Sequence, residues 1–200
     1  MRLTITMQVS VDGVVQGNGG RNENRRGGFE RGGWARGVPD AEVLTYIGEQ
    51  YQRADAFLFG RRTYDLFAGY WGVRKDLDDP IVGALNTRPK YVASTTLTDP
   101  AWADTTVLTG DLAAAIGELK AKPGGELQVH GSGTLVRWLL EHDLVDEINL
   151  LVIPVVVGQG ERLFPHDGPD LALELVESRP FPQGATLQVY RPAGRPRYAE

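Results

Sequence analysis

The sequence predicts an α/β domain whose mostly parallel sheet of about eight strands ends in an antiparallel hairpin, with four or five helices. Three observations lead to this fold class. Apolar and polar residues alternate strictly near the N-terminus, short apolar strands then alternate with helical segments, and two alternating runs near the C-terminus are joined by a Pro/Gly loop alone. Strands separated by helices favour parallel pairing, whereas strands without a helix between them pair antiparallel.

The composition supports one folded domain over residues 1–200. Hydrophobic residues make up 42% and charged residues 24%, close to average globular usage. The net charge of −5 disfavours a general binder of nucleic-acid phosphates, because such binding needs an excess of cations. The chain has no cysteine, which excludes disulfides and thiolate metal sites, and its three histidines lack ligand spacing, so no metal is expected.

No segment is typical of a membrane anchor or a secretion signal. The longest aliphatic stretch, residues 150–157, contains a proline and is far shorter than the ~20 residues of a membrane helix. The N-terminus alternates from its third residue and has no apolar signal core. We therefore expect a soluble, cytoplasmic protein without a membrane partner.

The N-terminal part predicts a strand, a long loop and a helix. Residues 3–11 alternate, so one face of this strand should lie on the core. Residues 16–37 hold eight glycines and five arginines without periodicity, and so long an irregular segment inside a domain is more often a functional lid than a linker. Asp40 is typical of an N-cap for a helix at 40–53, with Leu44 among its apolar positions, followed by Ile47 and Tyr51.

The remaining elements follow from apolar runs, capping residues and turn residues. We expect strands at residues 56–59, 91–94, 105–108, 127–129, 148–157, 171–175 and 187–189. We expect helices at residues 62–68, 79–86, 111–122 and 133–142, and a hairpin loop at 178–184. Pro154 cannot donate to a ladder, so within the strand 148–157 it should lie at a bulge or on an unpaired side.

Two strand-to-helix turns are candidate anion sites. In one, a buried strand runs through His130 into Gly131-Ser132-Gly133, which opens a helix. Unpaired amides at a helix N-terminus suit phosphate, although a glycine-rich turn without a ligand is equally compatible with this segment. In the other, residues 60–64 place two arginines in a first helical turn, where cations oppose the helix dipole unless an anion is bound. Two such turns in one sheet suggest a ligand with separated phosphates, such as a dinucleotide.

The loop at 16–37 also contains two Arg-Gly-Gly units, which superficially resemble RNA-binding segments. Glu23 and Glu30 interrupt their charge, and the chain is acidic overall. We therefore expect no nucleic-acid partner.

Six segments match one known family in order across residues 3–165. They are Ser10-Val-Asp-Gly13, Gly60-Arg-Arg-Thr-Tyr64, Lys90-Tyr-Val-Ala-Ser94, His130-Gly-Ser-Gly-Thr-Leu135, Leu144-Val-Asp-Glu147 and Pro154-Val-Val-Val-Gly-Gln-Gly160, which continues to Leu163-Phe164. The chain resembles the dihydrofolate reductase-like family, and most closely the solitary relatives of the riboflavin-biosynthesis reductase domain, which lack the attached deaminase. The resemblance implies a three-layer dihydrofolate reductase-like fold and a homodimer.

The resemblance implies NADPH along the carboxyl ends of the parallel strands. Residues 61–63 would face the adenosine phosphates, Ser94 the adenine side, and residues 132–135 the pyrophosphate. The backbone near Val9 and Gly17 would flank the nicotinamide. The full set of cofactor residues is Val9, Gly17, Gly60, Arg61, Arg62, Thr63, Ser94, Gly131, Ser132, Gly133, Thr134 and Leu135.

The family's substrate-binding residues are matched less directly in this sequence than its cofactor-binding residues. Folate reductases hold the pteridine with a carboxylate on the first helix, for which Asp40, Glu42 and Glu49 are available here. Asp12, Trp34 and Asp40 are the residues expected to bind substrate, with Trp34 as a stacking surface or as a packing residue. The riboflavin reductases commonly have Glu where this chain has His130, which is either a catalytic proton donor or an inert strand residue.

These features predict NADPH-dependent reduction of a small planar heterocycle or a carbonyl/imine compound, similar to a pterin or to 5-amino-6-(5-phosphoribosylamino)uracil. The alternative is a non-catalytic nucleotide-binding protein on the same fold, favoured by the lack of one clear catalytic carboxylate. The sequence does not identify the substrate.

Overall fold

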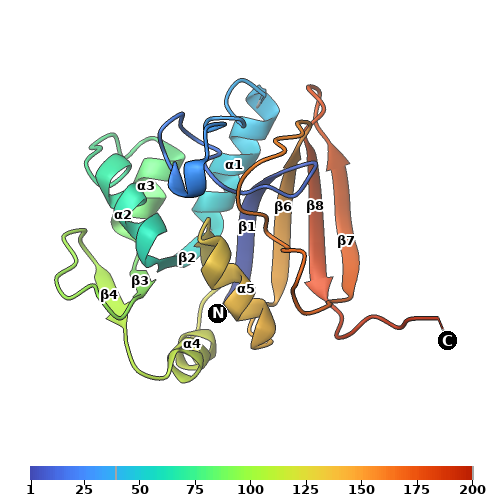
Figure 1. The fold of residues 1–200 in the computed structure, drawn as a ribbon. Coiled ribbons are helices and arrows are strands. Elements are labelled where there is room, and N and C mark those ends of the chain that lie inside the picture. Colours follow the sequence, from blue (N-terminus) through green and yellow to red (C-terminus); the bar gives the residue numbers. More distant parts are fainter. Residues whose placement is uncertain (39, 200) are drawn as a thin grey trace.

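One eight-stranded sheet runs through residues 1–38 and 40–199, the part of the chain that the computed structural model describes (Figure 1). Its strands are β1 (Arg2–Ser10), β2 (Ala54–Gly60), β3 (Lys90–Ala93), β4 (Thr105–Leu108), β5 (Glu126–His130), β6 (Glu147–Ile153), β7 (Leu173–Pro180) and β8 (Thr186–Pro192). The helices are α1 (Ala41–Arg53), α2 (Arg61–Tyr70), α3 (Pro80–Thr87), α4 (Leu112–Ala121) and α5 (Gly133–Glu141), with a short 3-10 helix, η1 (Arg26–Gly28), in the long loop.

The pairing of the strands confirms the predicted fold class. The order across the sheet is β4-β3-β2-β5-β1-β6-β8-β7. Strands β1 to β6 pair in parallel, and β8 pairs antiparallel with both β6 and β7. The described part of the chain holds no helix long and apolar enough to cross a membrane.

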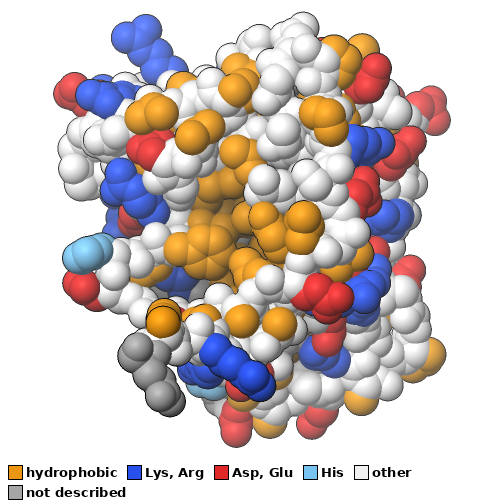
Figure 2. Space-filling model, turned by 90° about the vertical axis from the view of Figure 1, so that its right-hand side faces the viewer, with side chains coloured by type: hydrophobic (Ala, Val, Ile, Leu, Met, Phe, Trp, Pro, Cys, Tyr) orange, Lys and Arg blue, Asp and Glu red, His pale blue; other side chains and the backbone are white. Residues whose placement is uncertain are grey.

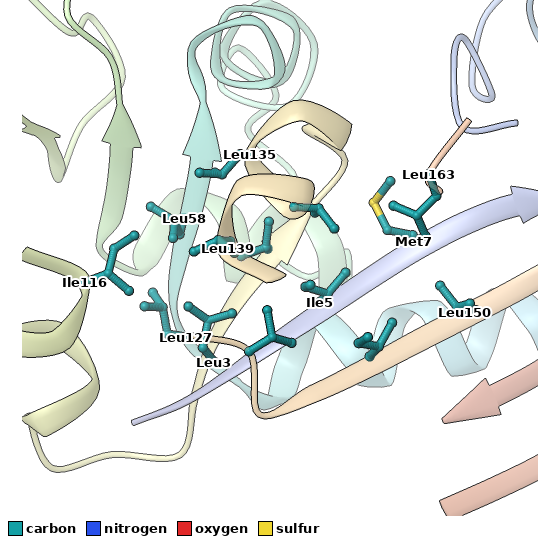
Figure 3. Packing of buried hydrophobic residues seen from close by; sticks show 14 of the residues in the cluster. Leu3, Ile5, Met7, Leu58, Ile116, Leu127, Leu135, Leu139, Leu150 and Leu163 are labelled. Atoms are coloured by element: carbon teal, nitrogen blue, oxygen red, sulfur yellow. The ribbon is translucent and has the colours of Figure 1, made fainter. Parts of the chain in front are cut away.

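Helices α4 and α5 cover one face of the sheet. Figure 3 shows Ile116 of α4 and Leu135 and Leu139 of α5 packed with Leu3 and Ile5 of β1, all of them buried. This cluster is the largest apolar core, and it fixes α5 directly over the centre of the sheet. The predicted apolar positions of β1 face this core: Leu3, Ile5, Met7 and Val9.

Helices α1, α2 and α3 cover the opposite face. Tyr51 of α1, Tyr64 of α2 and Leu85 of α3 lie in one buried cluster with Phe57 and Phe59 of β2. The molecule therefore has three layers, with the sheet in the middle (Figure 1).

The connections from two neighbouring strands leave the sheet on opposite faces. The chain after β1 leads to α1, whereas the chain after β5 leads to α5, and β1 and β5 are paired. In open α/β sheets such a reversal creates a crevice outside the carboxyl ends of the strands, where ligands bind.

Every predicted helix and strand is present, with three local differences. Leu44, predicted on the buried face of α1, is 59% exposed, because Val43, Tyr46 and Tyr51 form that face instead. The strand predicted to extend to residue 157 ends at Ile153, directly before Pro154, whose ring nitrogen has no proton for the ladder.

The third difference concerns the C-terminal hairpin. Strand β7 extends to Pro180 and β8 begins at Thr186, so the connecting loop is shorter than the predicted 178–184. Leu171 precedes β7, whose ladder with β8 shifts register between Leu175 and Glu177.

Asp40 fixes the start of α1, as predicted. One carboxylate oxygen accepts a hydrogen bond from Val43 N at 3.0 Å, and the other accepts one from Gln183 N at 3.0 Å. The side chain therefore caps the helix and also ties it to the hairpin loop.

We predict that Asp40→Ala lowers the free energy of unfolding by about 1 kcal/mol, because it removes the cap. Asp40→Asn should be more stable than Asp40→Ala, since asparagine caps about as well as aspartate and loses only the hydrogen bond to Gln183 N. Urea unfolding followed by circular dichroism measures both variants. Equal midpoints for wild type and Asp40→Ala would contradict the capping role.

Candidate cofactor and substrate site

The two predicted anion-binding turns meet at one hydroxyl group. The Ser132 hydroxyl accepts a hydrogen bond from Gly60 N at 2.9 Å and donates one to the Thr63 hydroxyl at 2.7 Å. The contact forms because β2 and β5 are neighbours, so the turns that follow them emerge side by side. The structure thus joins the start of α2 to the start of α5.

The backbone of the turn after β5 is left-handed at two successive residues. Gly131 has φ +64° and Ser132 has φ +58°. A Cβ on residue 131 would lie 3.2 Å from Thr63 Cγ2, so this position requires glycine for space as well as for conformation. A non-glycine residue in this region is strained, and the two hydrogen bonds of Ser132 hold it there.

The first turns of α2 and α5 together offer a set of backbone donors. The first amides of a helix have no partner within the helix, and the helix dipole adds partial positive charge there. Gly60, Thr63, Ser132, Gly133 and Thr134 all lie in these two turns. Leu135 belongs to the same turn of α5, but its side chain is buried in the core below.

The two arginines in the first helical turn of α2 have different surroundings. Arg61 Nε donates to both carboxylate oxygens of Asp65, at 3.0 and 2.8 Å. Arg62 is exposed and makes no ion pair with any described residue. Arg62 is therefore the cation of this turn that is available to a ligand.

Ser94 lies at the same edge of the sheet, directly after β3, which pairs with β2. Its hydroxyl accepts hydrogen bonds from Thr96 N at 3.2 Å and Leu97 N at 3.1 Å. It shapes the turn that flanks the two strand-to-helix turns.

Val9 and Gly17 lie on the other side of β5. The Val9 side chain is buried in the core beneath α5. Gly17 has φ +64°, and a Cβ there would lie 2.8 Å from the Phe29 ring. Gly17 thus lets the long loop fold closely over Phe29, and its carbonyl accepts a hydrogen bond from Gly33 N at 2.7 Å.

Asp12, an expected substrate ligand, holds two backbone segments together. Its carboxylate accepts hydrogen bonds from Val157 N at 2.9 Å, from Gly158 N at 2.8 Å and from the Ser10 hydroxyl at 2.7 Å. Burial acts to raise its pKa, but these hydrogen bonds outweigh burial and lower the pKa to about 2. Asp12 therefore joins the end of β1 to the segment after β6.

The other two expected substrate residues are also engaged within the fold. Both oxygens of Asp40 accept backbone hydrogen bonds, as described above. Trp34 is partly buried, and its indole N–H donates to Gln16 O at 2.8 Å. Of its two predicted roles, the structure shows the packing role directly.

His130 does not reach into the crevice, which corrects the expected placement of its side chain. It is 5% exposed, stacks on Tyr51 of α1 with ring centroids 4.1 Å apart, and shares a 2.8 Å hydrogen bond with Gln128 Oε1. The side chain points to the α1 face because Val129, one residue earlier, faces α5. Burial lowers its pKa to about 3, so the ring is neutral near pH 7. A proton donor needs contact with substrate and a pKa near the working pH, and this geometry provides neither.

A model of the RibD C-terminal domain matches residues 2–187. The chain belongs to the RibD C-terminal domain family. It is 25% identical over 191 residues to the uncharacterized protein YyaP of Bacillus subtilis (strain 168), and the match covers 94% of each protein. The resemblance predicted from the sequence is thereby confirmed, and it places the chain among reductase-type domains.

Two solved structures share the fold. The putative riboflavin biosynthesis protein of Shewanella sp. PV-4 has a TM-score of 0.73 at 24% identity, covering 96% of this chain and 99% of that one. The pyrimidine reductase-like protein of Corynebacterium diphtheriae has a TM-score of 0.62 at 14% identity, covering 96% and 92%. The RibD C-terminal fold is thus the observed arrangement of this chain.

A group of polar side chains buried in this RibD C-terminal fold was not predicted from the sequence. Thr4, Thr6 and Asn149 lie on the α1 face of the two central strands, and Thr4 and Asn149 are 0% and 2% exposed. Strict alternation suggested that the polar positions of β1 face away from the core. The signal that could have shown this was the number of parallel strands, because a central strand of a parallel sheet is covered on both faces.

We predict that His130 makes the folded protein less stable in acid. The unfolded chain protonates this histidine below about pH 6.5 and the folded chain only near pH 3, so stability is lost as pH falls through that interval. The loss should approach about 1.4 kcal/mol per pH unit. Urea midpoints of wild type should therefore fall more than those of His130→Phe between pH 7 and pH 4.5.

His142→Phe is the matched control, because His142 is exposed. Its midpoints should follow those of wild type. A parallel acid loss in wild type and His130→Phe would contradict the buried neutral state of His130.

Proposed function

We propose that this protein is a cytoplasmic NADPH-dependent reductase of a small planar heterocycle or carbonyl/imine compound. The observation that carries the proposal is the pair of helix N-termini joined through Ser132, with Arg62 beside them. The amides suit the pyrophosphate, and a separate cation suits the additional phosphate that distinguishes NADPH from NADH. No three carboxylate, histidine or cysteine side chains of the described residues are grouped to hold a metal ion.

The residues present fit such a cofactor. Gly131 lets the turn after β5 pack closely against Thr63, and the hydrogen bond from Ser132 to Thr63 fixes the two turns in place. NADPH when bound supplies a hydride. The amides of the two turns would hold the phosphates, the backbone near Val9 and Gly17 would flank the nicotinamide, and the 16–37 loop would exclude water.

The substrate is a pterin-like ring or a compound resembling 5-amino-6-(5-phosphoribosylamino)uracil. The family match supports this class, as do the names of the two solved structures, one a riboflavin biosynthesis protein and the other pyrimidine reductase-like. Because His130 is buried and neutral, the proton that accompanies the hydride comes from water or from another group of the complex.

A non-catalytic nucleotide-binding protein is the second candidate. One observation favours it: the carboxylates of Asp12 and Asp40 are both committed to backbone hydrogen bonds. NADPH consumption in the presence of a substrate panel separates the two candidates.

We predict that Arg62→Ala weakens NADPH binding by roughly 1.5–3 kcal/mol, the scale of a hydrogen bond between charged groups, or about tenfold to a hundredfold. NADH affinity should change little, because NADH lacks the phosphate that Arg62 would bind. Fluorescence titration of both cofactors at fixed, moderate salt measures this difference.

Arg61→Ala is the matched control, since Arg61 is paired with Asp65. It should weaken NADPH far less than Arg62→Ala does. Equal affinity of wild type for the two cofactors would contradict the proposal, as would parallel losses for NADH and NADPH in Arg62→Ala.

We also propose that the protein is a homodimer, as the family resemblance implies. Figure 2 shows an apolar hollow on the side of the molecule that carries the β7 edge of the sheet. Exposed apolar side chains on β7 include Leu175 at 55% and Val176 at 44%. Apolar surface of this kind marks interaction sites, and a second copy would cover it.

We predict that Leu175→Glu converts the dimer to a monomer, because it places a charge in the apolar contact. Size-exclusion chromatography with light scattering gives the mass. Leu44→Glu, on the exposed side of α1, should leave the dimer intact. A monomeric wild type at micromolar concentration would contradict the dimer.

A further inference from the structure

The long loop contains a closed lobe, residues 18–33, whose two ends are tied together. Gly33 N donates a hydrogen bond to Gly17 O at 2.7 Å, and Ala35 N donates one to Asn18 O at 3.2 Å. A compact segment of this length with adjoining ends is an Ω-loop, packed largely by its own residues. Such a lobe can change its position as one unit while its two ends stay joined.

One side of the lobe is fastened to residues 157–161 by several contacts. Phe29 is 2% exposed and packs into an apolar cluster with this segment. Gln159 Nε2 donates to Gly28 O at 3.0 Å, and Gln159 Oε1 accepts from Glu30 N at 3.3 Å. Because an apolar anchor and two hydrogen bonds act together, this side separates only at the cost of all of them.

Towards the sheet, the lobe is held by one hydrogen bond. Asn18 Nδ2 donates to Gln8 Oε1 at 2.9 Å, and within the described part of the chain no other hydrogen bond joins residues 18–33 to a strand. Gln8 is the last partly exposed position of β1, so this contact lies at the carboxyl edge, beside the crevice. Both side chains are uncharged and partly exposed, and one such bond is worth about fivefold in an equilibrium.

The unequal contacts determine how the lobe can move. Loss of one hydrogen bond frees the side next to β1, whereas the side at residues 157–161 stays bound. A hollow lined by Arg26, Phe29 and Gly160, among others, adjoins the bound side and leaves room for the lobe to turn.

We propose that residues 18–33 form a lid, which the Asn18–Gln8 hydrogen bond holds closed and which turns about residues 157–161. Opening uncovers the carboxyl end of β1 and admits a ligand to the crevice. The motion belongs to the free protein and is independent of which ligand the crevice accepts.

Trypsin measures the opening, because the lobe carries exposed arginines, among them Arg21 and Arg25. Cleavage follows the population of the open form when opening and closing are fast. Asn18→Leu removes the hydrogen bond at similar size, so cleavage after these arginines should rise about fivefold. Cleavage after Lys75, which is exposed between α2 and α3, is the internal control and should keep its rate.

Carboxylate variants separate the hydrogen bond from side-chain packing. Gln8→Glu keeps an acceptor for Asn18, and in Asn18→Asp the Gln8 amide turns and donates. Each single variant should therefore be cleaved at the wild-type rate. The double variant places two carboxylates against each other without a donor, so at pH 7.5 its lobe should be cleaved faster than that of Asn18→Leu.

Cross-links locate the side that opens. The chain has no cysteine, so Glu30→Cys with Gln159→Cys introduces the only two thiols, which a short bismaleimide joins. This link fixes the side that stays bound, and cleavage in the lobe should remain within twofold of the unlinked variant. The same link between Gln8→Cys and Asn18→Cys fixes the lid closed and should slow cleavage at least tenfold.

Each outcome supports or overturns the lid. Equal cleavage of wild type and Asn18→Leu overturns it, as does a double carboxylate variant that behaves like its single variants. A parallel rise after Lys75 shows general loosening of the fold and also overturns it. Slower cleavage from the link between residues 30 and 159 alone overturns the assigned direction of opening.

Discussion

The Ser132 hydroxyl is the contact on which the geometry of the crevice depends. It joins the turn after β2 to the turn after β5, and those turns open helices that cover opposite faces of the sheet. One side chain therefore sets the relative position of the two helix starts. Because Ser132 and Gly131 are both left-handed, the chain can make this contact immediately after β5 and still enter α5.

The long loop is held in place by side chains at both of its ends. Gln16 Nε2 donates to the carbonyls of Asn24 and Arg26, and Gln16 Oε1 accepts a hydrogen bond from Glu161 N at 2.9 Å. Arg31 donates to Val157 O. The loop is thus anchored to the segment after β6, which Asp12 holds from the other side. Gly17 allows close packing against Phe29, and Gly32 allows close packing against the backbone of Arg21, so this irregular segment is ordered.

The sequence predicted the elements well because their signals are local. Alternation marks a strand, and an aspartate before an apolar run marks a helix start, as Asp79 and Asp111 show by accepting bonds from the first turns of α3 and α4. The two strand-to-helix turns were predictable for the same reason. Their junction at Ser132 followed only from the pairing of β2 with β5, which no local pattern specifies.

Roles that depend on the direction of a side chain were not predictable. His130 ends a strand next to the crevice, yet the pleat turns its ring under Tyr51. Asp40 has the residue type of a catalytic carboxylate, but α1 and the hairpin loop use both of its oxygens. Leu44 fitted the predicted helical period, but in α1 the preceding residue, Val43, is buried and Leu44 is exposed.

Turns and strands contribute different residues to the central sheet. The two strand-to-helix turns follow β2 and β5, whereas the buried polar residues Thr4, Thr6 and Asn149 belong to β1 and β6. These three residues lie on rigid strands rather than in a loop. Exchange of one of them during evolution can therefore alter the polarity of the α1 face of the sheet while the geometry of both turns is inherited intact, so relatives of this fold can diverge there without rebuilding their scaffold.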